Sequence, residues 1–188
     1  MRSGRQYAMA LSATIYVFTI RLSHVDRNIY ESLDLRLARH PSESAEYLIT
    51  RLLAYCLEFT AGIAFSKGLS DPDEPAIVVR DLTGALRGWI EIGAPEAARL
   101  HKGAKAASHV AVYPTRDVTP WLARLAGERI HRAEQIGVQV IDAALIAQLA
   151  ARLERRMEFD LSVSEGVLYL SLGEETLTGG VERVGLAL

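Results

Sequence analysis

The sequence contains a single cysteine, Cys56, which cannot form a disulfide within the chain. Because disulfides mark oxidising compartments, one cysteine within an apolar helical pattern is typical of a reduced, intracellular protein. No apolar run approaches the ~20 residues that a membrane-spanning helix needs. No apolar stretch of signal-peptide length precedes Arg21, and we expect residues 1–10 to be a loose leader. The sequence therefore predicts a cytoplasmic protein without a membrane partner.

An excess of basic charge is also lacking. Twenty-one Lys and Arg residues stand against 23 Asp and Glu residues, which gives a formal net charge of -2. Tight binding to long duplex DNA comes largely from neutralising phosphates, so this composition argues against it. A small or structured nucleic acid, or a protein, is a more compatible partner.

The familiar catalytic and metal motifs are missing as well. The five histidines show neither the i, i+4 pair nor the cysteine partners of zinc sites. There is no GxGxxG, Walker loop or GxSxG elbow. Apolar helical neighbours indicate that Cys56 is a core residue rather than a nucleophile.

What is present is the composition of a globular protein with a sizeable core. The 188 residues are 49% hydrophobic and 23% charged, which fits a single domain spanning residues 1–188. Residues 12–23 and 28–39 favour two strands joined by the polar turn 24–27. Residues 43–59, which follow HPSES, carry apolar side chains at helical spacing and predict the clearest helix.

The rest of the chain alternates short strands and helices. Residues 86–92, a helix starting near Pro95 and ending near residue 107, and residues 109–113 predict a crossover unit with parallel strands. The remaining expected elements are strands at 63–65, 76–79 and 138–141, helices at 120–126 and 142–153, and an antiparallel meander at 159–163, 167–172 and 176–184. The pattern predicts an α/β (α+β) fold with a mixed sheet flanked by helices.

The most informative polar residue is Glu91, which lies between Ile90 and Ile92 in an otherwise apolar strand. A buried carboxylate is costly unless it is paired, hydrogen-bonded or bound to a metal. Asp73 and Glu74 begin the preceding strand, and an antiparallel hairpin would bring them to the same sheet edge as Glu91. Convergent carboxylates are what Mg²⁺ or Mn²⁺ requires.

Simpler interpretations of these acids remain open. Asp73 and Glu74 lie in a Pro-containing loop, where acidic residues commonly form turns. Glu91 is equally compatible with a structural salt bridge to an arginine. Glu46 lies in the first turn of the predicted helix, where an acid offsets the helix dipole.

A lysine near the acids would complete the chemistry. Lys102, on the helix after the Glu91 strand, is the candidate to stabilise charge on a phosphate, and Lys67 is its rival. Arg99 and Lys105 flank Lys102 in a basic stripe, whose simplest interpretation is a solvated helix face.

Three segments together resemble a known family: ARHPSE at the predicted helix, GLS followed by DEP, and WIEIG before a helix that bears a lysine. The chain resembles the YaeQ family of small bacterial proteins from about residue 11 to the C-terminal meander. The resemblance implies a variant of the PD-(D/E)XK restriction-endonuclease-like fold, with residues 43–141 as its core and residues 155–188 as an added meander.

In that superfamily a helix acid, an Asp on the second core strand and an acid followed two residues later by Lys form a Mg²⁺ site that cleaves phosphodiesters. Glu46 would match the helix acid, Asp73 or Glu74 the Asp, and Glu91 the third acid. Gly93 stands where the lysine belongs, so Lys102 would have to supply the charge.

Two functions follow from the resemblance. The first is a Mg²⁺-dependent nuclease in which Asp73 or Glu74 and Glu91 hold the metal, while Glu46 and Lys102 assist. The second is a catalytically inactive nuclease-fold module that binds nucleic acid or a protein, such as one of the transcription machinery. Convergence of Asp73 or Glu74 with Glu91, with a lysine directed at them, would favour the enzyme, whereas an arginine capping Glu91 would argue against it.

Overall fold

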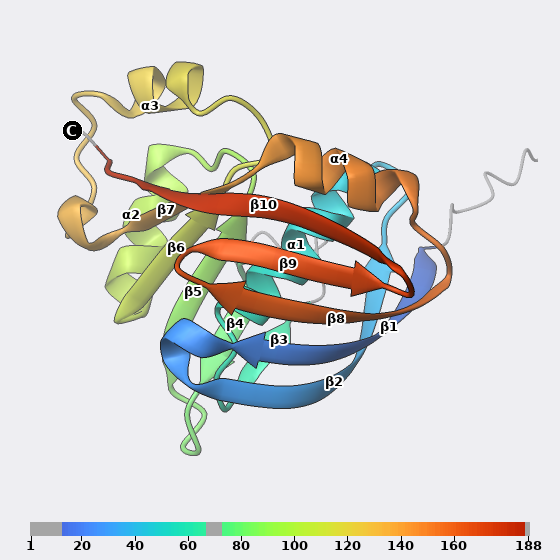
Figure 1. Cartoon of the computed structure of the whole chain (residues 1–188). Coiled ribbons are helices and arrows are strands. Elements are labelled where there is room, and N and C mark those ends of the chain that lie inside the picture. The colour runs from blue at the N-terminus through green and yellow to red at the C-terminus, as the bar shows by residue number, and fades with distance from the viewer. Residues whose placement is uncertain (1–12, 67–72, 187–188) are drawn as a thin grey trace, which may run out of the picture.

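The computed structural model describes residues 13–66 and 73–186, which form one ten-stranded mixed sheet with helices on both faces (Figure 1). The sheet order is β2-β1-β8-β9-β10-β7-β6-β5-β4-β3. The strands are β1 Thr14–His24, β2 Ile29–Arg39, β3 Ile63–Phe65, β4 Ile77–Arg80, β5 Leu86–Ile92, β6 His109–Tyr113, β7 Gly137–Ile141, β8 Arg156–Ser164, β9 Val167–Leu172 and β10 Glu175–Val184. The α-helices are α1 Ala45–Leu57, α2 Ala97–Ala106, α3 Thr119–Leu125 and α4 Ala143–Ala151, and two 3₁₀ turns span Val25–Arg27 and Ala133–Gln135.

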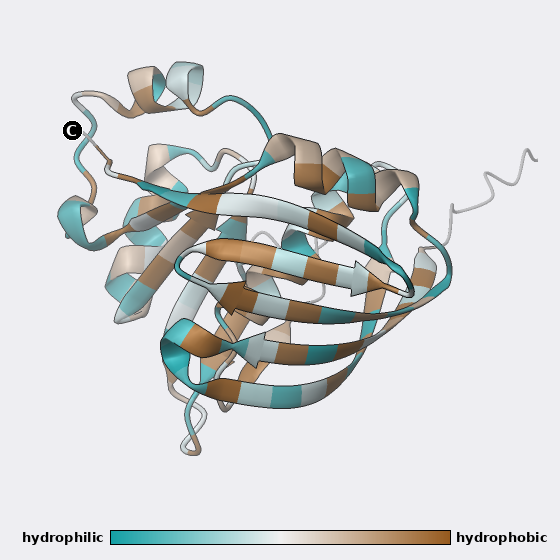
Figure 2. Ribbon diagram, viewed as in Figure 1, coloured by the Kyte–Doolittle hydropathy of each residue, from teal (hydrophilic) through white to brown (hydrophobic). Residues whose placement is uncertain are grey.

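The predicted N-terminal hairpin is confirmed. β1 and β2 pair antiparallel along their full length, with Phe18 opposite Leu35. Apolar residues alternate with polar ones along both strands, as Figure 2 shows, because successive side chains point to opposite faces. Asn28 closes the turn in the left-handed region at φ 53°, which asparagine tolerates better than most residues.

Helix α1 lies against the concave face of the strongly curved, barrel-like sheet (Figure 1). The helix begins where the Ser44 side chain accepts a hydrogen bond from the Tyr47 amide at 3.0 Å, which satisfies one of the first-turn N–H groups. Residues 48–56 are all buried, including Cys56. Helix α1 is therefore buried on nearly every side, as expected for a helix in the interior of the protein.

The predicted crossover unit is also confirmed, since β5 and β6 are parallel and α2 connects them. Helix α2 begins at Ala97, two residues after Pro95, with Glu96 as its N-cap. It covers the face of the sheet opposite α1, where a second core forms around Trp89, Val112 and Trp121. The sheet therefore separates two hydrophobic cores.

The C-terminal meander has a larger role than an added tail. β8, β9 and β10 form the predicted antiparallel meander. However, β8 pairs parallel with β1, and β10 pairs antiparallel with β7. The meander thus lies in the middle of the sheet and joins the N-terminal hairpin to the βαβ region.

The mixed α+β class is confirmed by this topology. Within the described residues, no helix has the length and apolar character needed to cross a membrane.

Candidate functional site

Glu91 is buried on the face of β5 that packs against α2. Its Oε1 accepts hydrogen bonds from Trp89 Nε1 and from Arg99 Nε, each at 2.6 Å. Burial raises the pKa of Glu91 above its usual range, although the hydrogen bonds and the charge of Arg99 act in the opposite direction. The carboxylate therefore has the two partners that a buried acid requires.

Arg99 connects the Glu91 strand to the acidic loop. Besides its contact with Glu91, its Nη2 donates to the backbone carbonyl of Glu74 at 2.7 Å. Its guanidinium carbon also lies 5.7 Å from the centroid of the Trp89 ring, within range of a cation–π interaction. Arg99 thus holds together α2, β5 and the start of β4.

The predicted lysine does meet one of the predicted acids. Lys102 Nζ lies 2.5 Å from Asp73 Oδ1, and this contact lowers the pKa of Asp73. Both side chains are largely exposed to solvent. The carboxylate of Glu74 lies 3.3 Å from Arg80 instead. Lys102 and Asp73 are therefore brought together, but as a surface pair.

The acids at the start of α1 have partners of their own. Glu43, just before the helix, is buried and pairs with buried Arg51 at 3.3 Å. Glu46 is exposed, and its pKa is lowered by its own backbone N–H and by the Ser44 side chain. Within the described residues, neither carboxylate forms a hydrogen bond or ion pair with Glu91, although Tyr47 of α1 is close enough to feel the charges of both Glu43 and Glu91.

The Glu91 carboxylate is already engaged by donors of the protein itself. Mg²⁺ takes several oxygen ligands, whereas Glu91 Oε1 already accepts two short hydrogen bonds, one of them from a cation. In residues 13–66 and 73–186, no cluster of three or more His, Cys, Asp or Glu side chains suits a metal ion. Lys67 lies outside these ranges. The magnesium site therefore stays a prediction.

A cleft does open beside these residues, at the C-terminal ends of the parallel strands β5, β6 and β7. Its two adjoining parts have volumes of about 590 Å³ and 750 Å³. The first part is bordered by the start of α1 and by Gly93, and the second by the start of α4. Clefts at this edge of a parallel sheet are common ligand sites.

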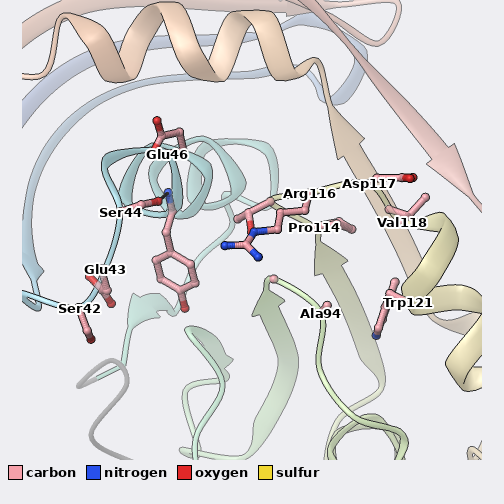
Figure 3. A pocket seen from close by; sticks show the side chains of 13 residues that line it. Ser42, Glu43, Ser44, Glu46, Ala94, Pro114, Arg116, Asp117, Val118 and Trp121 are labelled. Atoms are coloured by element: carbon pink, nitrogen blue, oxygen red, sulfur yellow. Dashed lines mark hydrogen bonds between the residues drawn. The ribbon is translucent and has the colours of Figure 1, made fainter.

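The charged residues that line the cleft are mostly acidic. Glu46, Asp117, Asp142 and Glu182 line it, and Arg116 adds one positive charge. Figure 3 shows Arg116 extending from the turn after β6 toward the first turn of α1, where Ser44 and Glu46 lie. Within the described part of the chain, the Arg116 guanidinium has no hydrogen-bond or ion-pair partner.

Two of these acids also stabilise helix starts. Asp142 accepts hydrogen bonds from the amides of Ala144 and Leu145, at the start of α4. Asp117 accepts one from the Thr119 amide, which holds the pKa of Asp117 below its usual range. These hydrogen bonds hold both carboxylates in position at the edge of the cleft.

Comparison with known proteins identifies the family. A family model described as YaeQ protein matches residues 9–180. The chain belongs to the YaeQ family. It is 33% identical over 165 residues to the uncharacterized protein YaeQ of Escherichia coli (strain K12), which covers 87% of this chain and 91% of the relative. The uncharacterized protein YaeQ of Salmonella typhi is 34% identical over 165 residues, which again cover 87% of this chain and 91% of the relative.

Solved structures of YaeQ proteins agree with the fold. The crystal structure of YaeQ from Xanthomonas axonopodis pv. citri matches with a TM-score of 0.84 and 30% identity, covering 93% of this chain and 99% of that one. The YaeQ structure from Pseudomonas syringae gives a TM-score of 0.83 and 28% identity, covering 92% and 96%. The matched part of the chain thus has the architecture of these YaeQ structures.

Sequence reasoning about this YaeQ-family chain missed the cleft residues Arg116 and Asp117. A signal was available, because both follow a strand predicted to lie parallel to its neighbour. Side chains just after such strands gather at the edge where ligands bind. For Arg99, the helical position alone did not reveal that its side chain turns inward to Glu91.

Proposed function

We propose that this YaeQ-family protein is a non-catalytic binding module built on a PD-(D/E)XK nuclease-like core. The order of elements from α1 to β6 supports such a core, since a helix, three antiparallel strands, a helix and a returning parallel strand follow one another. In this proposal the acids of the ancestral site serve structure rather than cleavage.

The observation that carries the proposal is the position of Arg99. Arg99 Nε lies 2.6 Å from Glu91 Oε1, and Arg99 Nη2 donates a hydrogen bond to the Glu74 carbonyl at 2.7 Å. A cation at that place supplies the charge compensation that a metal would otherwise provide. It also repels a divalent ion that approaches the same oxygen.

The charge of the cleft indicates the kind of partner. Four carboxylates and one arginine line its two parts, besides Glu43, which is paired with Arg51. Such a lining attracts cations and repels the phosphates of nucleic acid. The partner that fits is a protein with a lysine- or arginine-rich segment that enters the cleft.

Peptide binding tests this function. Fluorescence anisotropy should show salt-sensitive binding of a labelled Arg/Lys-rich peptide and weaker binding of single-stranded DNA. The double variant Glu46→Gln, Glu182→Gln should weaken peptide binding about tenfold, which corresponds to ~1.4 kcal/mol. Glu31→Gln, Glu128→Gln removes the same charge at exposed positions outside the cleft and should change affinity less than about twofold. Equal weakening in both double variants, or tighter binding of DNA, would reject the peptide partner.

The nuclease interpretation gives a different outcome in a second measurement. Calorimetry with Mn²⁺ or Mg²⁺ should detect no binding at millimolar metal, and no cleavage of single- or double-stranded DNA or RNA should follow. Metal binding that is lost in Glu91→Ala, together with metal-dependent cleavage by the parent, would establish a phosphodiesterase instead. In that case Lys102 would be the residue to test next.

A further inference from the structure

A second cavity lies away from the cleft, near the C-terminal end of α1 and the starts of β5 and β6. Its volume is about 650 Å³. Its lining shares no residue with either part of the cleft and includes His24, Arg27, Glu58, Arg80, Asp81, Arg87, His109 and Tyr113. Basic side chains outnumber acidic ones here, which is the reverse of the cleft.

A chain of three hydrogen-bonded side chains organises this cavity. Tyr113 Oη donates to Glu58 Oε1 at 2.7 Å, and His109 Nε2 lies 2.8 Å from Glu58 Oε2. Burial alone would raise the pKa of Glu58, but the hydrogen bonds from His109 and Tyr113 outweigh it and lower the pKa. The hydrogen bond to Glu58 in turn raises the pKa of His109 despite partial burial. Glu58 therefore favours the charged form of His109 and fixes its ring.

The second ring nitrogen of His109 remains available. Among the described residues, Nδ1 of His109 has no hydrogen-bond partner. In the charged ring this atom is a donor. The half-exposed His109 side chain can thus offer an oriented N–H to a molecule in the cavity.

Two arginines also offer unused donors. Asp81 Oδ2 accepts a hydrogen bond from Nε of Arg87 at 2.7 Å, and Nη2 of Arg87 lies 2.7 Å from the same oxygen as an ion pair. Arg27 donates Nη1 to the Leu57 carbonyl at 2.6 Å, at the end of α1. Within the part of the chain that the structure describes, Nη1 of Arg87 and both Nε and Nη2 of Arg27 have no partner.

The carboxylates of the cavity are already occupied. Asp81 Oδ1 accepts from the amides of Thr83 and Ala85 and from the Thr83 hydroxyl, so Asp81 builds the β4–β5 turn and positions Arg87. Glu58 is committed to His109 and Tyr113. Little acceptor capacity is left to attract a cation.

The remaining charged and titratable neighbours are mainly arginines, of which Arg80 is paired with Glu74. Arg80 lines the cavity, and Arg183 is close enough to lower the pKa of His109 by repulsion, as is Arg27. His24 is 6% exposed, and its Nδ1 has no partner among the described residues. Burial lowers the pKa of His24, which favours its neutral form.

We propose that this cavity is a second binding site, which takes a small oxyanion such as a phosphate or carboxylate group through Arg27, Arg87 and His109. Planar guanidinium groups and a charged imidazole are suited to oxyanions, because they donate charge-assisted hydrogen bonds, and all three side chains line this one cavity. The site is independent of the peptide cleft. Phosphate-bearing and carboxylate-bearing molecules share this recognition chemistry, and the test separates them.

Calorimetry with two probes tests the site. Inorganic phosphate and malonate are titrated separately into the full-length protein at low ionic strength and about pH 6.5, the usual pKa of histidine. We expect saturable binding of at least one probe, and the tighter probe identifies the anion class. Arg87→Gln and His109→Gln should each weaken it about tenfold or more, because each removes one cationic donor.

Matched variants control for overall charge and for folding. Arg36→Gln and His131→Gln change exposed residues outside this cavity and should leave binding unchanged. Thermal unfolding verifies that every variant is folded, and the NMR signal of the His109 ring should shift when the bound probe is added. Absence of heat for both probes at about 10 mM, or equal weakening in the control variants, would overturn the proposal. The two sites can be tested separately, because the cleft and this cavity share no lining residue. The Glu46→Gln, Glu182→Gln double variant of the cleft should therefore bind the anion as the parent does.

Discussion

Arg99 and Lys102 lie one helical turn apart on α2, yet they meet acids in opposite environments. Arg99 contacts Glu91, whose side chain is 6% exposed, while Lys102 contacts Asp73, whose side chain is 81% exposed. Removing the cation would therefore have a different effect in each ion pair. In one case a buried carboxylate loses its cation, and in the other a solvated carboxylate loses a neighbour.

Replacing these two cations separately should reveal the difference. Arg99→Ala should lower the free energy of unfolding by about 3–5 kcal/mol, because Glu91 would remain buried without its cation. Lys102→Ala should leave the urea midpoint nearly unchanged, because exposed pairs are screened by solvent. Urea unfolding of both variants measures this. A similar loss for both would contradict the structural role assigned to Arg99.

The pH dependence of the Arg99→Ala variant gives a second check. Without Arg99, burial should raise the pKa of Glu91 further, because the charged form loses its compensation. An acid with a raised pKa in the folded state favours folding when it is protonated. The loss of stability should therefore shrink as the pH falls toward about 4.3, the ordinary pKa of glutamate. Chemical unfolding at several pH values, compared with the parent, tests this, and a loss that does not change with pH would count against it.

His109 should make stability depend on pH near neutrality. Its pKa is raised in the folded protein, so its contribution is present below the unfolded pKa of about 6.5 and is lost as the pH rises through the folded pKa. We expect the loss to stay below about 1 kcal/mol, because the side chain is 54% exposed. The unfolding temperature, followed from about pH 6 to pH 9, should fall less in His109→Gln than in the parent. Parallel curves would show that the Glu58 contact contributes little.

Cys56 should be inert in the folded protein. The side chain is fully buried in α1, and burial raises the pKa of its thiol to about 12. Since the thiolate is the reactive form, iodoacetamide should modify the native protein far more slowly than the urea-unfolded protein. Mass spectrometry measures the modified fraction. Rapid labelling of the native chain would contradict this burial.

Gly103 should not tolerate a larger residue. A Cβ at this position would lie 2.7 Å from Cδ1 of Trp89, so α2 can approach β5 closely only with glycine there. Gly103→Ala should lower the free energy of unfolding by about 1–3 kcal/mol through overpacking, despite the better helix propensity of alanine. Gly185→Ala is the matched control, since a Cβ there meets nothing within 4 Å. Urea unfolding compares the two, and equal stabilities would exclude the clash.

The fold was more predictable from the sequence than the site. The hairpin, α1 and the β5-α2-β6 crossover follow from local patterns, because periodicity and turn residues report which side of an element is buried. The parallel pairing of Val17 in β1 with Arg156 in β8 was not predictable. Local sequence patterns do not specify which of two strands far apart in the sequence pair with each other.

The candidate site shows the same limit at the scale of side chains. An apolar strand indicated that Glu91 needs a partner, and Arg99 provides it. The sequence did not identify Arg99, because a helix places several basic residues at similar spacing and only the packing of α2 on β5 decides which one reaches inward. Arg116 has no apolar pattern around it, so only the position of its turn at the sheet edge reveals it.

The pairing of β1 with β8 has a consequence for how the chain is made. β1 finds its second neighbour only after more than a hundred further residues have been synthesised, since Val17 lies beside Arg156. Until then the hairpin keeps one edge of β1 unpaired and exposed to other chains. Contacts this distant in sequence slow folding and lengthen that interval. The sheet can therefore close around α1 only once β8 has been synthesised.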